Sequence, residues 1–245
     1  MAYGRKLAIV AGICAALALM SRADAELATP DPSGPEAMRA ELTRAWDDAT
    51  ETWRRILGER TYANELPQIN FVATVRPSHC YGLYINAGPV YCSGNNTVFI
   101  SIDEMERLSQ RLGGAEPAGL AFLVAHELGH HVQKATGRFV VLSNLMRANP
   151  QRTRELVLRF ELEADCLAGV WASNSRAFAS NAAVRKTMLA TIAEIGDDKA
   201  QSAAGGLRDP ATYTHGTSQQ RQTWYGKGLA AGEASACSVL EAAVI

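Results

Sequence analysis

Apolar positions recur at helical spacing along much of the chain, and turn-forming residues separate these stretches. Met38, Leu42 and Trp46 follow the helical period, so the pattern predicts an amphipathic helix over residues 35–58. The same criteria predict helices over residues 117–137, 149–173 and 181–195, and a last helix through Trp224 that opens at a capping box of Thr217 and Gln220.

Two short stretches instead carry the β-branched and apolar residues that are typical of strands. They are residues 69–75 (INFVATV) and residues 97–102 (TVFISI), and a loop rich in Gly, Pro and Asn separates them. Helices therefore outnumber strands, which predicts a helix-rich α+β fold with a small sheet near the middle of the chain. We expect one domain over residues 35–245, preceded by a flexible Pro-rich segment, residues 26–34.

The N-terminal stretch differs from the rest of the chain. Arg5 and Lys6 precede an apolar run of 14 residues, and a small-x-small sequence, ADA, ends at Ala25. This order predicts a secretory signal peptide over residues 1–25, and hence an exported protein that is periplasmic or secreted. The alternative is an uncleaved anchor, although the apolar run is short for a membrane span.

The net charge of the chain mainly excludes classes of binding partner. The chain carries 24 Lys and Arg against 25 Asp and Glu. Loss of Arg5, Lys6, Arg22 and Asp24 with the leader would leave 21 basic and 24 acidic residues, a net charge of −3. This balance does not favour nucleic acid, and no basic run indicates a lipid surface. We expect no stable membrane span after leader cleavage.

Four cysteines remain once Cys14 leaves with the leader, and an even number suits disulfides in an exported protein. Cys80 and Cys92 bracket a turn-rich stretch. We therefore predict a disulfide between them and a second one between Cys166 and Cys237. The alternative is a four-cysteine zinc site, but the usual short C-x-x-C spacing is absent.

The sequence HELGH, at residues 126–130, is a metal-binding signal. On a helix, His126 and His130 lie one turn apart on the same face, where both imidazoles can reach one zinc ion. Glu127 lies beside them, as the general base of zinc peptidases does. The alternative is a pair of buried, hydrogen-bonded histidines on a packing helix. His131 points about 100° away around the helix, so we expect no metal contact from it.

A catalytic zinc needs a third protein ligand. One zinc peptidase pattern, H-E-x-x-H-x-x-G-x-x-H, is excluded because Gln133 and Thr136 occupy its last two defined positions. In the sequence ELEAD, Glu161 and Asp165 are four residues apart and share a helix face, whereas Glu163 points elsewhere. One carboxylate can bind metal while the other receives the N–H of a ligand histidine. The alternative is a solvated acidic stripe.

Four segments, AHELGHHVQ, ELEADCLAGVWA, AEIGDDK and YTHGTSQQRQTWYGKG, together resemble the bacterial neutral zinc metallopeptidase family of YpfJ type. The resemblance covers roughly residues 66–240. HELGH with E-x-x-A-D is also similar to the wider gluzincin group, which includes the CAAX prenyl proteases. The resemblance implies a zincin-like domain with one zinc ion, Glu161 as third ligand and Asp165 as the support of the histidines. It leaves Glu163 without a role.

The C-terminal part of the chain adds one candidate. Thr214-His215-Gly216, followed by Arg221, resembles the T-H-P…R segment of the CAAX-type proteases, whose histidine is thought to help stabilise the reaction intermediate. Gly216 stands where those proteases have proline. The alternative for His215 is a structural histidine near a helix start.

These features predict a zinc-dependent peptidase. Zinc held by His126, His130 and Glu161 would lower the pKa of its water toward about 7. Glu127 would take the proton and pass it to the leaving amine, and His215 would help to hold the oxyanion.

A peptide or unfolded protein is the expected substrate. The strand near residues 98–101 could accept an extended peptide edge-on. No terminus-binding feature is evident in the sequence, which favours an endopeptidase. The alternative function is a catalytically silent, zinc-stabilised binding or scaffolding module of the cell envelope. Such a module needs the metal ligands but not Glu127, so the presence of Glu127 favours the enzyme.

Overall fold

A computed structural model describes residues 34–58, 67–80, 88–114, 117–178, 181–203 and 205–245. The predicted signal peptide and residues 26–33 of the flexible segment lie outside these ranges. The contacts of Pro32–Ile245 form one compact unit. Among the described helices, none combines the length and the apolar character that a membrane span requires.

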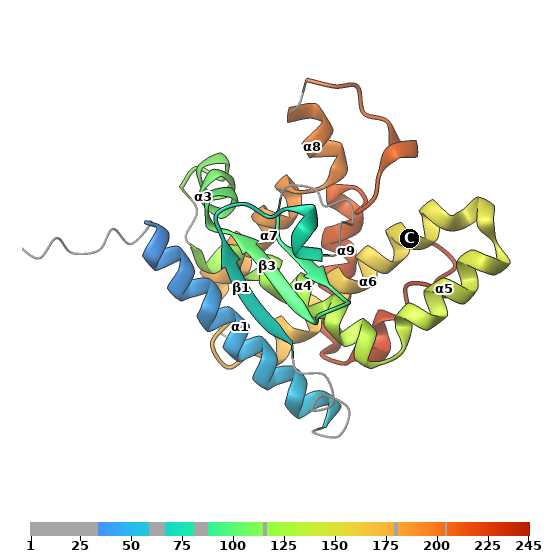
Figure 1. The fold of residues 1–245 in the computed structure, drawn as a ribbon, viewed down its shortest axis with the longest axis horizontal. Coiled ribbons are helices and arrows are strands. Elements are labelled where there is room, and N and C mark those ends of the chain that lie inside the picture. The colour runs from blue at the N-terminus through green and yellow to red at the C-terminus, as the bar shows by residue number, and fades with distance from the viewer. Residues whose placement is uncertain (1–33, 59–66, 81–87, 115–116, 179–180, 204) are drawn as a thin grey trace, which may run out of the picture. The chain divides into compact units, whose positions relative to one another are not determined.

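A three-stranded sheet has the order β1-β3-β2 (Figure 1). β1 (Gln68–Val72) runs parallel to β3 (Thr97–Ser101), and β2 (Val90–Cys92) runs antiparallel to β3. Every residue of β3 is buried, which suits its β-branched and aromatic side chains. Because β3 has a strand on each side, the expected docking of a peptide along residues 98–101 is wrong. Of the described strands, β2 is the one whose residues line the cavity between the sheet and the helices.

Helix α4 (Ala121–Ala135) contacts α1, α6 and β2 and lies at the centre of the unit. Twelve of its fifteen residues are buried, because its apolar run AFLVA leaves no face for solvent. The polar side chains that it carries inward therefore need partners. The other α-helices are α1 (Pro35–Leu57), α3 (Ile102–Arg111), α5 (Arg138–Ala148), α6 (Thr153–Asn174), α7 (Ala182–Glu194), α8 (Asp197–Ala203) and α9 (Ser218–Ala231).

The predicted helices are confirmed as α1, α4, α6, α7 and α9, and Thr217 and Gln220 form the predicted capping box at the start of α9. The sequence pattern does not predict β2, α3, α5 or α8. α3 follows β3 without a break, because Ser101 ends the strand and accepts a hydrogen bond from the N–H of Glu104 as the helix cap. α5 follows α4 after only Thr136 and Gly137, and Gly137 adopts a left-handed conformation.

Two glycines bring α6 and α9 into direct backbone contact. A side-chain carbon on Gly169 of α6 would overlap the Tyr225 carbonyl, and one on Gly228 of α9 would overlap the Cys166 carbonyl. The predicted disulfide between Cys166 and Cys237, with Cα atoms 5.5 Å apart, joins α6 to the segment after α9. The two helices are therefore held as one element, which places the start of α9 against the middle of α6.

Replacement of Gly228 by Ala should lower the free energy of unfolding by about 1–3 kcal/mol, because the added methyl group must separate two backbones. Gly226→Ala on the same helix is the matched control, since no atom lies within 4 Å of its added carbon. There alanine should be neutral or stabilise by up to about 1 kcal/mol. Urea unfolding of both variants measures the difference, and equal stabilities would contradict the close packing of α6 on α9.

Candidate metal centre

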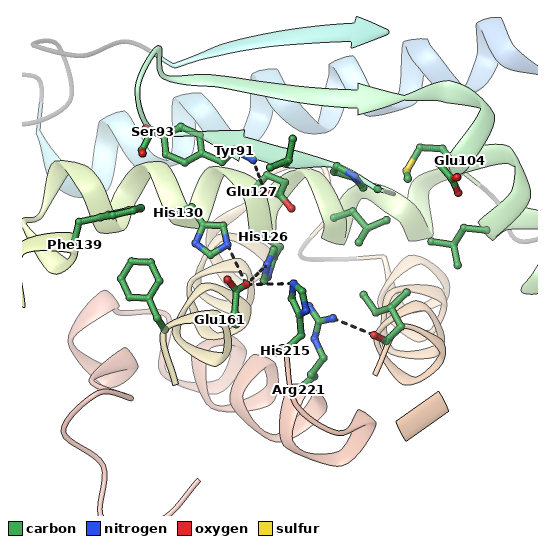
Figure 2. A pocket seen from close by; sticks show the side chains of 18 of the residues that line it. Tyr91, Ser93, Glu104, His126, Glu127, His130, Phe139, Glu161, His215 and Arg221 are labelled. Atoms are coloured by element: carbon green, nitrogen blue, oxygen red, sulfur yellow. Dashed lines mark hydrogen bonds and ion pairs between the residues drawn. The ribbon is translucent and has the colours of Figure 1, made fainter. Parts of the chain in front are cut away.

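Three side chains from α4 and α6 converge in a cleft (Figure 2). His126 and His130 lie one turn apart on α4, and Glu161 faces them from α6. Glu161 Oε2 is 3.2 Å from the Nε2 atom of each histidine. One donor atom from each of the three residues lies within 4.8 Å of the other two, so that together they could hold a metal ion.

The donor set fits zinc, which takes imidazole nitrogens and a carboxylate oxygen in catalytic sites. Glu161 Oε2 is buried, yet no hydrogen bond of acceptable geometry reaches it. An anionic oxygen in that situation is unfavourable unless a cation is near. The Glu161 side chain is only 18% exposed, which excludes the solvated acidic stripe considered from the sequence.

Asp165 supports His126 from behind, where the sequence pattern places it. Its Oδ1 is 2.8 Å from Nδ1 of His126, which leaves Nε2 directed at the cleft. Arg221 of α9 donates two hydrogen bonds of 2.8 Å to the same carboxylate. Burial alone would raise the pKa of Asp165, but the charges and hydrogen bonds of Arg221 and His126 outweigh it and lower that pKa. The carboxylate is thus held ionised against the histidine.

His130 is supported by an amide that the sequence pattern did not reveal. Its Nδ1 lies 2.8 Å from Oε1 of Gln133, one turn further along α4. Gln133 is fully buried, and its Nε2 donates to the Phe160 carbonyl at 2.8 Å and to Glu163 at 3.3 Å. The spacing of three residues on one helix is the signal that could have identified Gln133.

Glu163 belongs to the hydrogen-bond network behind the candidate ligands. It is 2% exposed and accepts two hydrogen bonds from Arg138, at 2.8 and 2.7 Å. Arg138 also binds the carboxylate of Glu241 near the end of the chain. The resemblance gives Glu163 no role, whereas the structure places it behind Gln133 and joins α6 to α5 and to the C-terminal segment.

Glu127 lies between the ligand histidines and the sheet (Figure 2). Its Oε2 accepts a 2.7 Å hydrogen bond from the backbone N–H of Tyr91 in β2. The Tyr91 hydroxyl lies 3.0 Å from Nδ1 of His131, which is fully buried. His131 therefore supports β2 from α4 and is not among the possible metal ligands, as predicted. The predicted disulfide of Cys92 with Cys80 anchors the end of the same strand.

His215 is the third imidazole near Glu161. Its Nε2 lies 3.6 Å from Glu161 Oε2, and its side chain is partly exposed to the cleft (Figure 2). Burial lowers the pKa of His215, and the positive charges of Arg221 and His126 lower it further, against the opposing effect of Glu161. The imidazole is therefore held in its neutral form, with one N–H to donate.

The ligands lie in a cavity of about 540 Å³. Phe139 stands at the His130 end of the cleft and Glu104 at the opposite end (Figure 2). Phe139 contacts Phe160, whose ring stacks near His130 with centroids 5.8 Å apart. Apolar side chains line the cavity at several further points: Met105, Leu108, Leu123, Leu142 and Ile195.

Comparison with known proteins agrees with this geometry. The family model described as "Putative neutral zinc metallopeptidase" matches residues 2–240. The chain belongs to this family. Its metal is zinc, and His126, His130 and Glu161 form a group of the donor type that could hold this ion. Family membership also identifies the helix-rich α+β fold as that of a zincin-like peptidase domain.

Two relatives of the chain are described as uncharacterised proteins. YpfJ of Escherichia coli is 30% identical over 191 residues, which are 77% of this chain and 66% of YpfJ. A protein of Mycobacterium tuberculosis is 34% identical over 172 residues, which are 64% of this chain and 56% of that protein. The chain thus covers less than two thirds of the length of these relatives. No solved structure matches the chain.

Proposed function

We propose that the protein is a zinc-dependent endopeptidase in which Glu127 activates the attacking water. The observation that carries this proposal is the position of the Glu127 carboxylate, next to the three candidate ligands and inside the cleft. A zinc site that only stabilises a fold needs no such carboxylate, because its ligands close the coordination shell. The alternative, two histidines that merely pack, leaves the buried Glu161 oxygen without a hydrogen bond of acceptable geometry.

In the proposed reaction, His126, His130 and Glu161 hold the metal. Zinc, when bound, supplies Lewis acidity that makes a water acidic near neutral pH and polarises a carbonyl. Glu127 takes the proton of this water on its carboxylate and delivers it to the departing amine nitrogen. The Tyr91 N–H keeps the Glu127 carboxylate oriented during both transfers.

His215 is proposed to stabilise the negative charge that develops on the carbonyl oxygen of the substrate. Its neutral imidazole, with Nε2 facing the cleft, can donate one hydrogen bond there. Donors placed in advance at the site of developing charge need no reorganisation during the reaction, which is why they are effective.

The proposed substrate is an extended peptide or unfolded protein. β2 ends the described sheet and borders the cleft through Val90 and Tyr91, so a peptide can lie along it by strand addition. Apolar residues on both sides of the ligands, such as Leu123 and Phe139, favour apolar side chains around the cleaved bond. The two disulfides fit an exported protein, and we propose a periplasmic or secreted location.

The test is hydrolysis of unfolded casein by the chain from residue 26 onward, loaded with zinc. We expect cleavage into internal fragments, loss of cleavage after removal of zinc by a chelator, and recovery after zinc is added back. Inactivity of the zinc-loaded protein toward casein and toward a mixed peptide library would contradict the proposal. That result would favour a zinc-stabilised binding module.

Zinc binding should release protons near neutral pH, because the pKa values of both candidate ligand histidines are raised in the metal-free protein and zinc binds the neutral imidazole. Burial alone would lower the pKa of His126, but Asp165, with help from Glu161, raises it to about 10. Burial likewise opposes a raised pKa at His130, and the charge of Glu161 prevails. Protons therefore compete with zinc, and zinc affinity should rise with pH through the neutral range.

Calorimetric titration in buffers of different ionisation enthalpy measures this proton release. His215→Ala should release the same number of protons, since His215 is not one of the three candidate ligands. Zinc binding without proton release, or affinity that falls as pH rises, would contradict the predicted protonation of His126 and His130.

A further inference from the structure

The turn Ile195-Gly196-Asp197-Asp198 belongs to a segment that the proposed reaction leaves unexplained. It follows α7 and begins α8, far in sequence from the residues on α4 and α6 that form the metal centre. Oδ1 of Asp197 lies 3.9 Å from Nδ1 of His215. What the turn does contact is the backbone around His215.

A single oxygen of Asp197 binds three consecutive backbone amides. Its Oδ2 accepts hydrogen bonds from the N–H groups of Thr214, His215 and Gly216, at 2.7, 2.7 and 2.9 Å. The N–H of Asp197 donates in return to the Gly216 carbonyl at 2.9 Å. Hydrogen bonds from amides to an ionised carboxylate are stronger than those between neutral groups. The backbone on both sides of His215 is therefore fixed by one residue.

The imidazole is oriented by the same arrangement. Nδ1 of His215 lies 2.9 Å from the Thr214 hydroxyl and 3.9 Å from Oδ1 of Asp197, so Nε2 is the nitrogen that faces Glu161. Gly216, with φ of +95°, turns the chain away directly after His215. Few other residues adopt this conformation without strain, which explains a glycine where the resembling proteases carry proline.

The turn is itself held on both sides. Asp198 Oδ1 accepts hydrogen bonds from the N–H and the hydroxyl of Ser218 at the start of α9, at 2.7 and 3.0 Å. Gly196 has no room for a side chain, because Ser218 lies against it. Arg221, which also binds Asp165, donates to the Ile195 carbonyl at 3.3 Å. The turn is thus connected through Arg221 to the support of His126.

We propose that Asp197 is a positioning residue whose carboxylate keeps Nε2 of His215 beside the metal ligands. The inference rests on the proposed function of His215 in holding the oxyanion. Without the carboxylate, three backbone amides lose their acceptor and the segment gains conformational freedom. A displacement of a reacting group by about 1 Å can cost on the order of 100-fold in rate. Loss of the carboxylate would therefore reduce the fraction of molecules in which the His215 imidazole occupies its reactive position.

The kinetic test is a double-mutant cycle with Asp197→Ala and His215→Ala in the zinc-loaded protein. Asp197→Ala should lower kcat by about 10- to 100-fold, with a smaller change in KM, while zinc content stays the same. In the His215→Ala background, the same substitution should cause almost no further loss. Asp197→Asn keeps an oxygen acceptor and should recover part of the activity. Additive losses in the double variant would overturn the proposal.

Asp198→Ala is the matched control, because Asp198 contacts Ser218 and not the three amides around His215. It should reduce stability without the selective loss of kcat. If it lowers kcat as much as Asp197→Ala does, the effect comes from general loosening of the turn and the positioning role is wrong.

A spectroscopic readout separates this inference from the proposed function. In ¹H–¹⁵N spectra of histidine rings, Asp197→Ala should shift and broaden the His215 signals of the zinc-loaded protein. The signals of His79, which packs on Phe99 away from the cleft, should stay unchanged. Unchanged His215 signals would overturn the proposal even if the wild-type protein hydrolyses no substrate. Shifted signals in a protein without hydrolysis would support the positioning of His215 and contradict only the peptidase function.

Discussion

Replacement of Glu127 by Gln should abolish casein hydrolysis while zinc stays bound. The glutamine amide has nearly the same size as the carboxylate, and its oxygen can still accept the hydrogen bond from the Tyr91 N–H. It cannot accept a proton from water, so the general base is lost. We expect kcat to fall by about 10²–10⁴-fold, with zinc content and thermal stability close to those of the wild type. Rates of fragment release and zinc content by elemental analysis measure the two effects.

Glu104→Gln provides the matched control for this substitution. Glu104 lies at the far end of the same cleft and pairs with Arg107 at 2.8 Å, away from the ligands (Figure 2). Its replacement removes the same charge from the same cleft and should leave kcat within a few-fold of the wild type. Equal losses in the two variants would mean that cleft charge, and not proton transfer by Glu127, explains the effect. Undiminished hydrolysis by Glu127→Gln would exclude Glu127 as the base.

Replacement of Glu161 by Ala should weaken zinc binding by at least about 100-fold. Loss of a partner behind a ligand already costs about 10- to 100-fold in affinity, and Glu161 is itself a candidate ligand. The two histidines that remain lose both the third donor and the negative charge that favours a cation between them. Competition with a chelator of known zinc affinity measures the change, and hydrolysis should disappear in parallel.

Glu163→Ala is the control on the same helix. Glu163 is more deeply buried than Glu161, but its partners are Arg138 and Gln133. Its loss leaves the Arg138 charge partly unpaired and should destabilise the protein, with a much smaller effect on zinc than Glu161→Ala. If Glu163→Ala releases zinc and Glu161→Ala retains it, the third ligand is assigned to the wrong carboxylate.

The ligand cluster was predictable because its geometry is short-range. Two histidines four residues apart share a helix face in any α-helix, and Glu161 and Asp165 have the same spacing. A single contact between α4 and α6 is then enough to bring these two helix faces together, whatever the relative direction of the two helices. The disulfides were predictable for a related reason, as Cys80 and Cys92 are close in sequence and their pairing leaves one choice for the others.

Other parts of the site depend on tertiary contacts that no local pattern records. β2 has three residues inside a loop rich in Gly, Pro and Asn, so strand propensity does not identify it. Its position beside β3 explains why a peptide cannot dock along residues 98–101, as their place just before the HELGH helix had suggested. In the sequence, Gln133 only excludes a longer zinc motif, and Asp197 is only part of the resembling segment AEIGDDK. Asp197 acquires its role from backbone amides of a segment distant in sequence, and Gln133 acquires its role from His130 on the same helix together with the Phe160 carbonyl of α6.

The backbone contact between α6 and α9 has a mechanical consequence. Because Gly169 and Gly228 have no side chains that could change rotamer, the two helices should move as one rigid body. Glu161, Asp165 and Arg221 all belong to these two helices, so the distances between them should stay constant when the width of the cleft changes. Widening must instead come from β2 or α5, which contact these helices and α4 through side-chain hydrogen bonds, from Tyr91 N–H to Glu127 and from Arg138 to Glu163. Crystals grown with and without a bound peptide should differ at those two elements first.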